Sequence, residues 1–194
     1  MADRIFIHNI SFSYPNKAPI FSHFSTSIHT ETATALTAPS GSGKTTLLHL
    51  IAGLIKPQEG QILFPQSHNR ISMVFQENRL IPSASIAKNI RLVNKKLTDS
   101  EIFYLLKQAK LERYAACKPS SLSGGEQRRA AIIRALAADY DILLLDEPFT
   151  GLDAGIKETI SQFIHNRTQS KTLILVTHNP DDIALLKCKM AVQL

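Results

Sequence analysis

Residues 36–53, "LTAPSGSGKTTLLHLIAG", decide the fold of this chain. The β-branched and small residues that lead into the Gly/Ser cluster predict a strand that ends in a tight turn. From Thr45 onward the apolar residues take helical spacing, so we expect a helix directly after the turn. Strand, glycine-rich loop and helix in this order are the setting of the phosphate-binding motif G-x-x-x-x-G-K-S/T. Ala38 is the one departure, because it stands where the motif has its first glycine.

Each residue type in this loop suits a phosphate group. Gly41 and Gly43 let backbone N–H groups turn inward, and the amino end of the helix adds its positive dipole. Lys44 supplies a mobile positive charge, and Thr45 offers a hydroxyl to Mg²⁺, which prefers oxygen ligands. A Gly/Ser linker with an incidental lysine would lack the flanking strand and helix. Ala38 weakens the match only if its position needs a backbone angle that alanine reaches at a cost.

A second half of a phosphoryl-transfer site follows in "DILLLDEP", residues 141–148. Its apolar residues predict a buried strand, and Asp146 emerges at the carboxyl end, where open α/β sheets bind ligands. Asp146 is placed to hold Mg²⁺ through water, and Glu147 to polarise a water for in-line attack on a γ-phosphate. An acidic turn capping the strand is the plainer interpretation, but it accounts less well for two carboxylates followed by Pro148.

A second glycine cluster stands in "LSGGEQRRAAIIRAL", residues 122–136. A serine and two glycines precede a predicted helix, which makes a second anion site in the same chain. One nucleotide does not need two such sites. The sequence therefore suggests that this second cluster meets a phosphate bound by another copy of the chain.

Apolar strands alternate with helices along the remainder of the chain, which predicts a parallel sheet covered on both faces. Residues 86–117 look mostly helical, with Thr98 as an N-cap and Glu101 three residues later. At 194 residues the chain has the length of a single domain. It ends at Leu194, so we expect no appended regulatory domain.

Composition narrows the class further. The net charge is +6, and we interpret the basic clusters at residues 128–129 and 88–96 as solvated faces. Cys117 and Cys188 show no metal-ligand spacing, so we expect reduced, buried thiols. The opening residues alternate apolar and polar, and no apolar run approaches the roughly 20 residues that span a bilayer. We therefore expect neither a signal peptide nor a membrane span.

Taken together, the motifs resemble the nucleotide-binding subunit of ATP-binding cassette (ABC) transporters over nearly the whole chain. The matching motifs are "APSGSGKTT" for Walker A, Gln76 for the Q-loop, "LSGGEQRR" for the signature, "ILLLDEP" for Walker B, "GLD" for the D-loop and "VTH" for the switch histidine. The resemblance implies an α/β P-loop NTPase with a mostly parallel core sheet and an N-terminal antiparallel β part. It further implies one ABC ATPase domain over residues 1–194, with a helical subdomain inserted at about residues 77–130.

In this family two subunits pack head to tail around ATP and Mg²⁺, so the resemblance implies a site shared between two copies. The nucleotide would contact one copy through Pro39, Ser40, Gly41, Ser42, Gly43, Lys44, Thr45 and Thr46. It would contact the other through Ser123, Gly124, Gly125, Gln127 and Asp153. A plain helix-starting aspartate is the alternative for Asp153.

The resemblance also assigns catalytic roles. Glu147 would be the general base, and His178 would hold the γ-phosphate and the attacking water. Gln76 would touch Mg²⁺ together with Thr45 and Asp146, and would sense the transmembrane partner. Tyr14 stands where the family keeps an aromatic that stacks on adenine, although a lone tyrosine is more often a core or rim residue.

The implied function is an ATP-hydrolysing subunit that powers transport through a separate membrane permease, on the cytoplasmic face of the membrane. "FQENRLIPSASIAKNIRLV" resembles importers of the nitrate, sulfonate and taurine group, with a solute-binding protein as a further candidate partner and no nucleic acid. The competing hypothesis is a soluble ABC-type ATPase that moves no solute. A binding module without hydrolysis is disfavoured because Glu147 and His178 are both present, and the chain lacks the guanine-recognition motif of a G protein.

Overall fold

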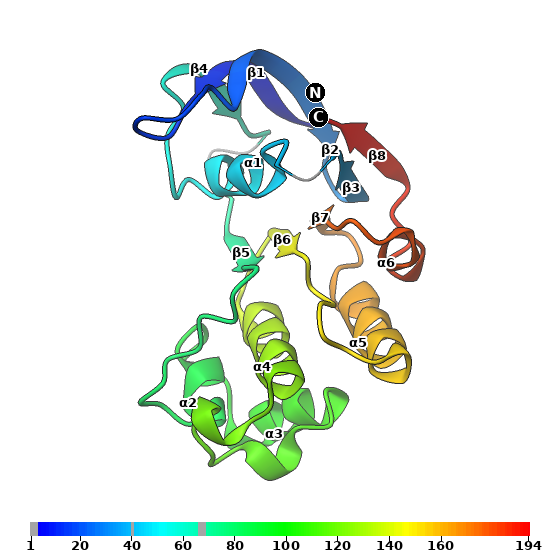
Figure 1. Ribbon diagram of the computed structural model, residues 1–194. Helices are drawn as coiled ribbons and strands as arrows, with labels where there is room; N and C mark the ends of the chain where they lie inside the picture. Colours follow the sequence, from blue (N-terminus) through cyan, green and yellow to red (C-terminus); the bar gives the residue numbers. More distant parts are fainter. Residues whose placement is uncertain (1–3, 40, 66–68) are drawn as a thin grey trace.

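The computed structural model describes residues 4–39, 41–65 and 69–194. Within these residues the strands form two sheets (Figure 1). The smaller sheet is antiparallel, with the order β2-β1-β4, and consists of β1 (Arg4–Phe12), β2 (Phe21–His29) and β4 (Glu59–Leu63). The larger sheet has the order β5-β6-β7-β3-β8, and each of its pairings is parallel. Its strands are β3 (Ala33–Thr37), β5 (Ile71–Val74), β6 (Ile142–Asp146), β7 (Thr172–Val176) and β8 (Met190–Gln193).

Helices cover the parallel sheet and fill the chain between its strands. They are α1 (Lys44–Ile51), α2 (Ile86–Arg91), α3 (Asp99–Gln108), α4 (Gly124–Ala137), α5 (Ala154–Arg167) and α6 (Pro180–Leu185), with short 3₁₀ turns at Glu112–Tyr114 and Pro119–Ser121. In Figure 1, α1 lies with the antiparallel sheet, whereas α2, α3 and α4 lie at the opposite end of the molecule. No helix in the described part of the chain has the length and apolar character needed to cross a membrane.

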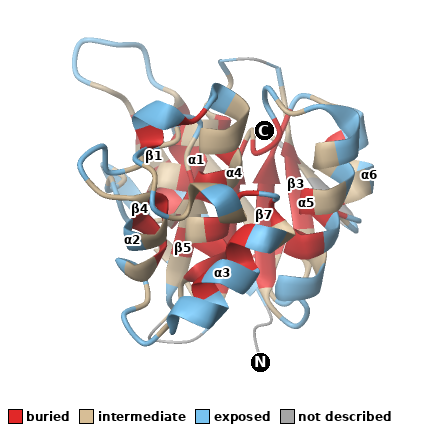
Figure 2. Cartoon of the chain, turned by 90° about the horizontal axis from the view of Figure 1, so that it is seen from below, coloured by how far each residue is buried: buried red, intermediate tan, exposed pale blue. Residues whose placement is uncertain are grey.

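The central strands are buried on both faces because their side chains alternate between two cores. Leu143 and Leu145 of β6 pack with the helices α4 and α5, whereas Ile142 and Leu144 pack with α1 and β1. A strand directs successive side chains to opposite faces, so a continuous apolar run serves both cores. Figure 2 shows the buried residues gathered in the strands and on the inner faces of the helices.

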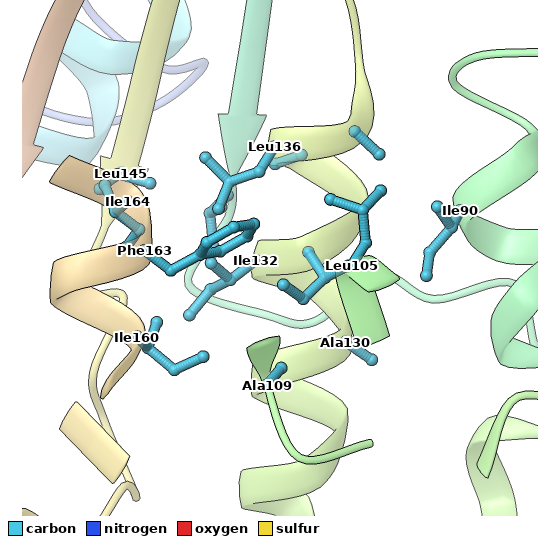
Figure 3. Close-up of a cluster of buried hydrophobic side chains, with 14 of the residues drawn as sticks. Ile90, Leu105, Ala109, Ala130, Ile132, Leu136, Leu145, Ile160, Phe163 and Ile164 are labelled. Atoms are coloured by element: carbon cyan, nitrogen blue, oxygen red, sulfur yellow. The ribbon is translucent and has the colours of Figure 1, made fainter. Parts of the chain in front are cut away.

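The larger core joins the helical part to the sheet. Figure 3 shows Phe163 of α5 close to Leu136 and Ile132 of α4, and Ile164 of α5 beside Leu145 of β6. Full burial of a side chain of this size contributes about 1.5–3 kcal/mol through its removal from water. The helical segment between β5 and β6 is therefore anchored to the same core as the parallel sheet.

Side-chain caps set where the helices begin. Thr98 and Ser123 each accept a hydrogen bond from a backbone N–H three residues later, and the glutamates at those positions bond back to the cap backbone. Asp153 caps α5 by accepting from Ile156 N at 3.0 Å. Such caps satisfy N–H groups that have no partner inside the helix. The predicted N-cap at Thr98 is confirmed.

The predicted fold class is confirmed, and the structure adds two strands that the sequence did not mark and corrects three further predictions. The strands β2 and β4 had no clear apolar alternation in the sequence, since β2 is only partly buried and most of β4 is exposed. The helix predicted to run on past residue 108 ends there, because Lys110 turns the chain with a left-handed φ of 55°. Arg128 is buried rather than part of a solvated face, and both cysteines are half-buried rather than buried.

Candidate functional site

A cavity of about 620 Å³ lies at the carboxyl ends of the parallel strands, where the sequence predicts a ligand site. Residues from distant parts of the chain meet there. Its lining consists of Ile20, Gly41, Gly43, Lys44, Thr45, Thr46, Gln76, Asp146, Glu147, Val176 and His178. A second cavity of about 610 Å³, which includes Lys95, Tyr140 and Lys171, contains none of the predicted site residues.

The loop between β3 and α1 holds its lysine inside the cavity. Lys44 Nζ donates to the carbonyl oxygens of Ala38 and Pro39, each at 2.8 Å. Gly41 and Gly43 have left-handed φ angles of 83° and 96°, which glycine adopts without steric cost. A Cβ atom at Gly43 would lie 2.4 Å from Ile20 Cγ2, so this position has no room for a side chain.

The loop also contains two serines, Ser40 and Ser42. Ser42 has a buried hydroxyl that lacks a hydrogen-bond partner among the described residues. A polar ligand in the loop would satisfy it. Ser40, which the sequence also assigns to the nucleotide, lies outside the described residues.

Asp146 ends β6 with a carboxylate that the described residues leave without a hydrogen bond. Its side chain lines the cavity, the residue is 1% exposed, and neither Oδ atom has a partner in the described chain. Burial raises the pKa of this carboxyl above its ordinary value, and the nearby Thr45 hydroxyl opposes that rise. Because a buried anion without a partner is costly, the site favours an added cation beside Asp146.

The oxygen-bearing residues of the cavity suit Mg²⁺, which needs few protein ligands, better than they suit a metal ion held entirely by protein side chains. Thr45 and Gln76 line the same cavity as Asp146 and present oxygen atoms. Across residues 4–39, 41–65 and 69–194, no three His, Cys, Asp or Glu side chains are grouped to hold a metal ion. Mg²⁺ commonly takes one or two protein ligands and completes its shell with waters and substrate phosphates.

Glu147 and His178 meet across two neighbouring strand ends. The His178 Nδ1 atom lies 2.9 Å from Glu147 Oε1, and both residues line the cavity. The Glu147 side chain is 16% exposed, while that of His178 is 79% exposed. Glu147 has a left-handed φ of 47°, which is uncommon for a residue with a side chain. The carboxylate of Glu147 and the imidazole of His178 are therefore in contact within the lining of the cavity.

A short hydrogen-bond chain supports the turn that carries His178. The Thr177 hydroxyl donates to Asp182 Oδ2 at 2.8 Å and accepts from Asn179 N at 3.1 Å. Asp182 is buried, and Lys157 Nζ lies 3.4 Å from its other carboxylate oxygen. The residues after β7 are therefore fixed by α5 and α6 rather than left as a free loop.

The structure does not bring every predicted residue to this cavity. Tyr14 is outside the lining and packs edge-on against Phe12, with ring centroids 5.1 Å apart. The signature residues at the start of α4 and Asp153 at the start of α5 are also outside it. These residues are Ser123, Gly124, Gly125, Gln127 and Asp153. Asp153 acts here as the helix cap that the plainer interpretation expected.

Sequence reasoning missed three residues of the site and its support. Ile20 and Val176 line the cavity; nothing in the local sequence marks Ile20, and Val176 stands in the quoted "VTH" motif without a role of its own. Arg128 is buried beneath the Q-loop and the residues after β6. Its helical spacing from Ile132 and Ala135, both buried, was the signal that could have found it.

Comparisons with known proteins agree on one family. A model of the ABC transporter family matches residues 21–150, more than half of the chain. The chain is 36% identical over 181 residues to the Fe(3+) ions import ATP-binding protein FbpC 1 of Rhodococcus jostii, covering 85% of this chain and 52% of that protein. It is 33% identical over 185 residues to the thiamine import ATP-binding protein ThiQ of Escherichia coli K12, covering 87% and 80%. The chain spans about half the length of several of the curated relatives it matches.

Solved structures share the whole fold. One, described as a dimeric post-hydrolysis state of the ATP-binding cassette MJ0796 bound to ADP and Pi, has a TM-score of 0.85 at 28% identity. It matches over 98% of this chain and 94% of its own. An ATP-bound bacterial Atm1-family exporter reaches a TM-score of 0.88 over 99% of this chain and 37% of its own, and at 24% identity that likeness concerns the fold. With the family model and the thiamine relative, these matches establish that the chain belongs to the ABC transporter family.

Proposed function

We propose that this chain binds ATP with Mg²⁺ and hydrolyses it, as the ATP-binding subunit of a transport system. One observation carries the proposal: the lysine loop, an unpaired buried carboxylate and the Glu147–His178 pair face a single cavity. A positive loop suits the phosphates, and a carboxylate next to an imidazole suits activation of a water.

In the proposed mechanism, Lys44 and the backbone N–H groups of its loop bind the β- and γ-phosphate oxygens. Thr45, Gln76 and Asp146 would hold Mg²⁺, which when bound neutralises phosphate charge. Glu147 accepts a proton from the attacking water, while His178 holds the γ-phosphate side of the site. The contact of 2.9 Å between His178 and Glu147 fixes the carboxylate relative to the imidazole.

The site is proposed to be completed by a second copy. Ser123 and Gly125 begin α4 away from the chain's own cavity, which supports a role toward the partner's nucleotide. Gly124, Gln127 and Asp153 would belong to the same interface, with Tyr14 at the adenine end. The dimeric cassette structures among the similar proteins support this arrangement.

Coupling to import through a separate permease is the wider part of the proposal. The similar proteins include import ATP-binding proteins for Fe(3+), spermidine/putrescine and thiamine. We place the chain on the cytoplasmic face of the membrane, with the helical subdomain of about residues 77–130 toward the permease. A solute-binding protein and a substrate of the nitrate, sulfonate and taurine type rest only on the sequence of residues 75–93.

The first experiment replaces the proposed base, Glu147→Gln. We expect phosphate release from Mg-ATP to fall about 100-fold or more, because a general base contributes rate in this range. Binding of a fluorescent ATP analogue should remain, since the loop of Lys44 is untouched. The matched control is Glu158→Gln, the same change on the exposed face of α5. Unchanged hydrolysis by Glu147→Gln would overturn the assignment of the base.

A further inference from the structure

The guanidinium of Arg128 is buried in the first half of α4 with every donor used. The residue is 3% exposed. A guanidinium has five N–H groups in a rigid plane. In this structure they face the backbone carbonyls of Phe75, Gln76, Asp146, Glu147 and Pro148.

These carbonyls belong to two separate segments of the site. Nε donates to Pro148 O at 2.9 Å, and Nη2 donates to Asp146 O and Glu147 O, each at 2.6 Å. Nη1 bonds Phe75 O and lies 3.3 Å from Gln76 O. One side chain thus joins the segment that carries Glu147 to the segment that carries Gln76, and both to the signature helix.

The charge of Arg128 is met by dipoles rather than by a salt bridge. Among the described residues it forms no ion pair with a carboxylate, and burial lowers the pKa of the guanidinium, opposed by the nearby charges of Asp146 and Glu147. Burying a cation in this way is costly unless all of its donors are satisfied. If this position only had to fill space, an apolar side chain of similar length, such as methionine, would do so without the free-energy cost of burying a charge.

The backbone that Arg128 holds is an unfavourable one. Glu147 has a left-handed φ of 47°, a conformation that is sterically strained for a residue with a side chain. Arg128 binds the carbonyls of Glu147 and of the residues on either side of it. These three bonds oppose relaxation of the turn that directs the carboxylate into the cavity.

We infer that Arg128 is a positioning residue for hydrolysis, which holds Glu147 and Gln76 in register with each other and with the start of the signature helix. The inference rests on the proposed ATPase function and adds to it a residue outside the cavity. Arg128 itself is not part of the lining of the cavity. Its loss should therefore slow the chemical step while leaving nucleotide binding nearly intact.

The test compares two arginines of one helix. Arg134 is also partly buried on α4 and donates to the carbonyls of Arg79 and Asn78, but not to residues 146–148. We would make Arg128→Met, Arg128→Lys, Arg134→Met and Arg134→Lys in the full chain. For each we would measure kcat and KM for Mg-ATP, binding of a fluorescent ATP analogue and thermal unfolding.

For Arg128→Met we expect kcat to fall about tenfold to 100-fold, because small misplacement of a catalytic group has effects of this size. KM and analogue binding should stay within about threefold of wild type, since Lys44 and its loop are untouched. Arg128→Lys keeps the charge and three donors and should recover part of kcat. Both Arg134 variants should keep kcat within about threefold, even where their thermal stability falls.

A folded Arg128→Met with wild-type kcat would overturn the inference, and so would a loss of kcat matched by Arg134→Met. If Arg128→Met does not fold, the lysine pair decides: equal kcat in Arg128→Lys and Arg134→Lys overturns it, and a lower kcat in Arg128→Lys supports it. Failure of the proposed function is seen separately, because wild type would then release no phosphate above the Glu147→Gln background.

Discussion

At the scale of single residues, the question raised by Ala38 comes down to backbone geometry. The loop places its left-handed angles at Gly41 and Gly43, and Ala38 is not among the described non-glycine residues with positive φ. What Ala38 contributes is its carbonyl, which accepts from Lys44. Any residue supplies that group, so the departure from the motif falls where a side chain is tolerated.

Replacement of Ala38 by glycine should therefore change nucleotide affinity by less than about threefold, with a small loss of stability from the added freedom of the unfolded chain. Gly43→Ala is the contrast, because its Cβ would meet Ile20 and its φ of 96° disfavours a side chain. We expect it to lose most binding. Titration of both variants with a fluorescent ATP analogue gives the comparison, and a large gain for Ala38→Gly would contradict the geometry.

At the scale of elements, the amino end of α4 depends on an ionised glutamate. Hydrogen bonds from Tyr114 and from the backbone N–H of Ser123 lower the pKa of Glu126 to about 2, from a usual 4.5. A carboxyl whose pKa is lower in the folded state adds stability above its unfolded pKa and loses it as the pH falls. The cap should thus weaken from about pH 4.5 down to about pH 2.

Glu126→Gln should consequently cost about 1 kcal/mol of unfolding free energy at pH 7, a typical value for a cap interaction. The cost should shrink at pH 3, which lies below the unfolded pKa of about 4.5, because folding must then release a proton to form the charged cap. Urea unfolding of both proteins at the two pH values measures it. Glu158→Gln corrects for the loss of one surface charge. A cost independent of pH would mean that the carboxylate charge is not what stabilises α4.

The elements that sequence reasoning anticipated are those whose signal is local. The strand "DILLLD" and the capped start of the helix after Thr98 carry their own pattern and form as expected, although that helix ends at Gln108. The strands β2 and β4 are stabilised by pairing with β1, which no local pattern reports. Arg128 was misjudged for the same reason, because its partners lie 18 to 53 positions away.

At the scale of the whole molecule, the proposed site is divided between two copies. A mixture of Ser123→Arg and Lys44→Ala chains tests this. In a mixed head-to-tail dimer one site would have both defects and the other neither. If the chains exchange freely, about half of the dimers in an equal mixture are mixed, and each has one intact site. Roughly a quarter of all sites should then be intact. Phosphate release by the mixture, set against each variant alone, is the measurement. No gain at any mixing ratio would contradict the shared site.

At the proposed base, Glu147, the left-handed turn sets the stability of the fold against the proposed chemistry. Glycine would adopt φ of 47° with no steric penalty, so a chain optimised only to stay folded would gain by discarding the carboxylate. Strained catalytic positions commonly show this trade-off. Ranking substitutions by thermal stability alone would therefore favour the change that removes the proposed general base.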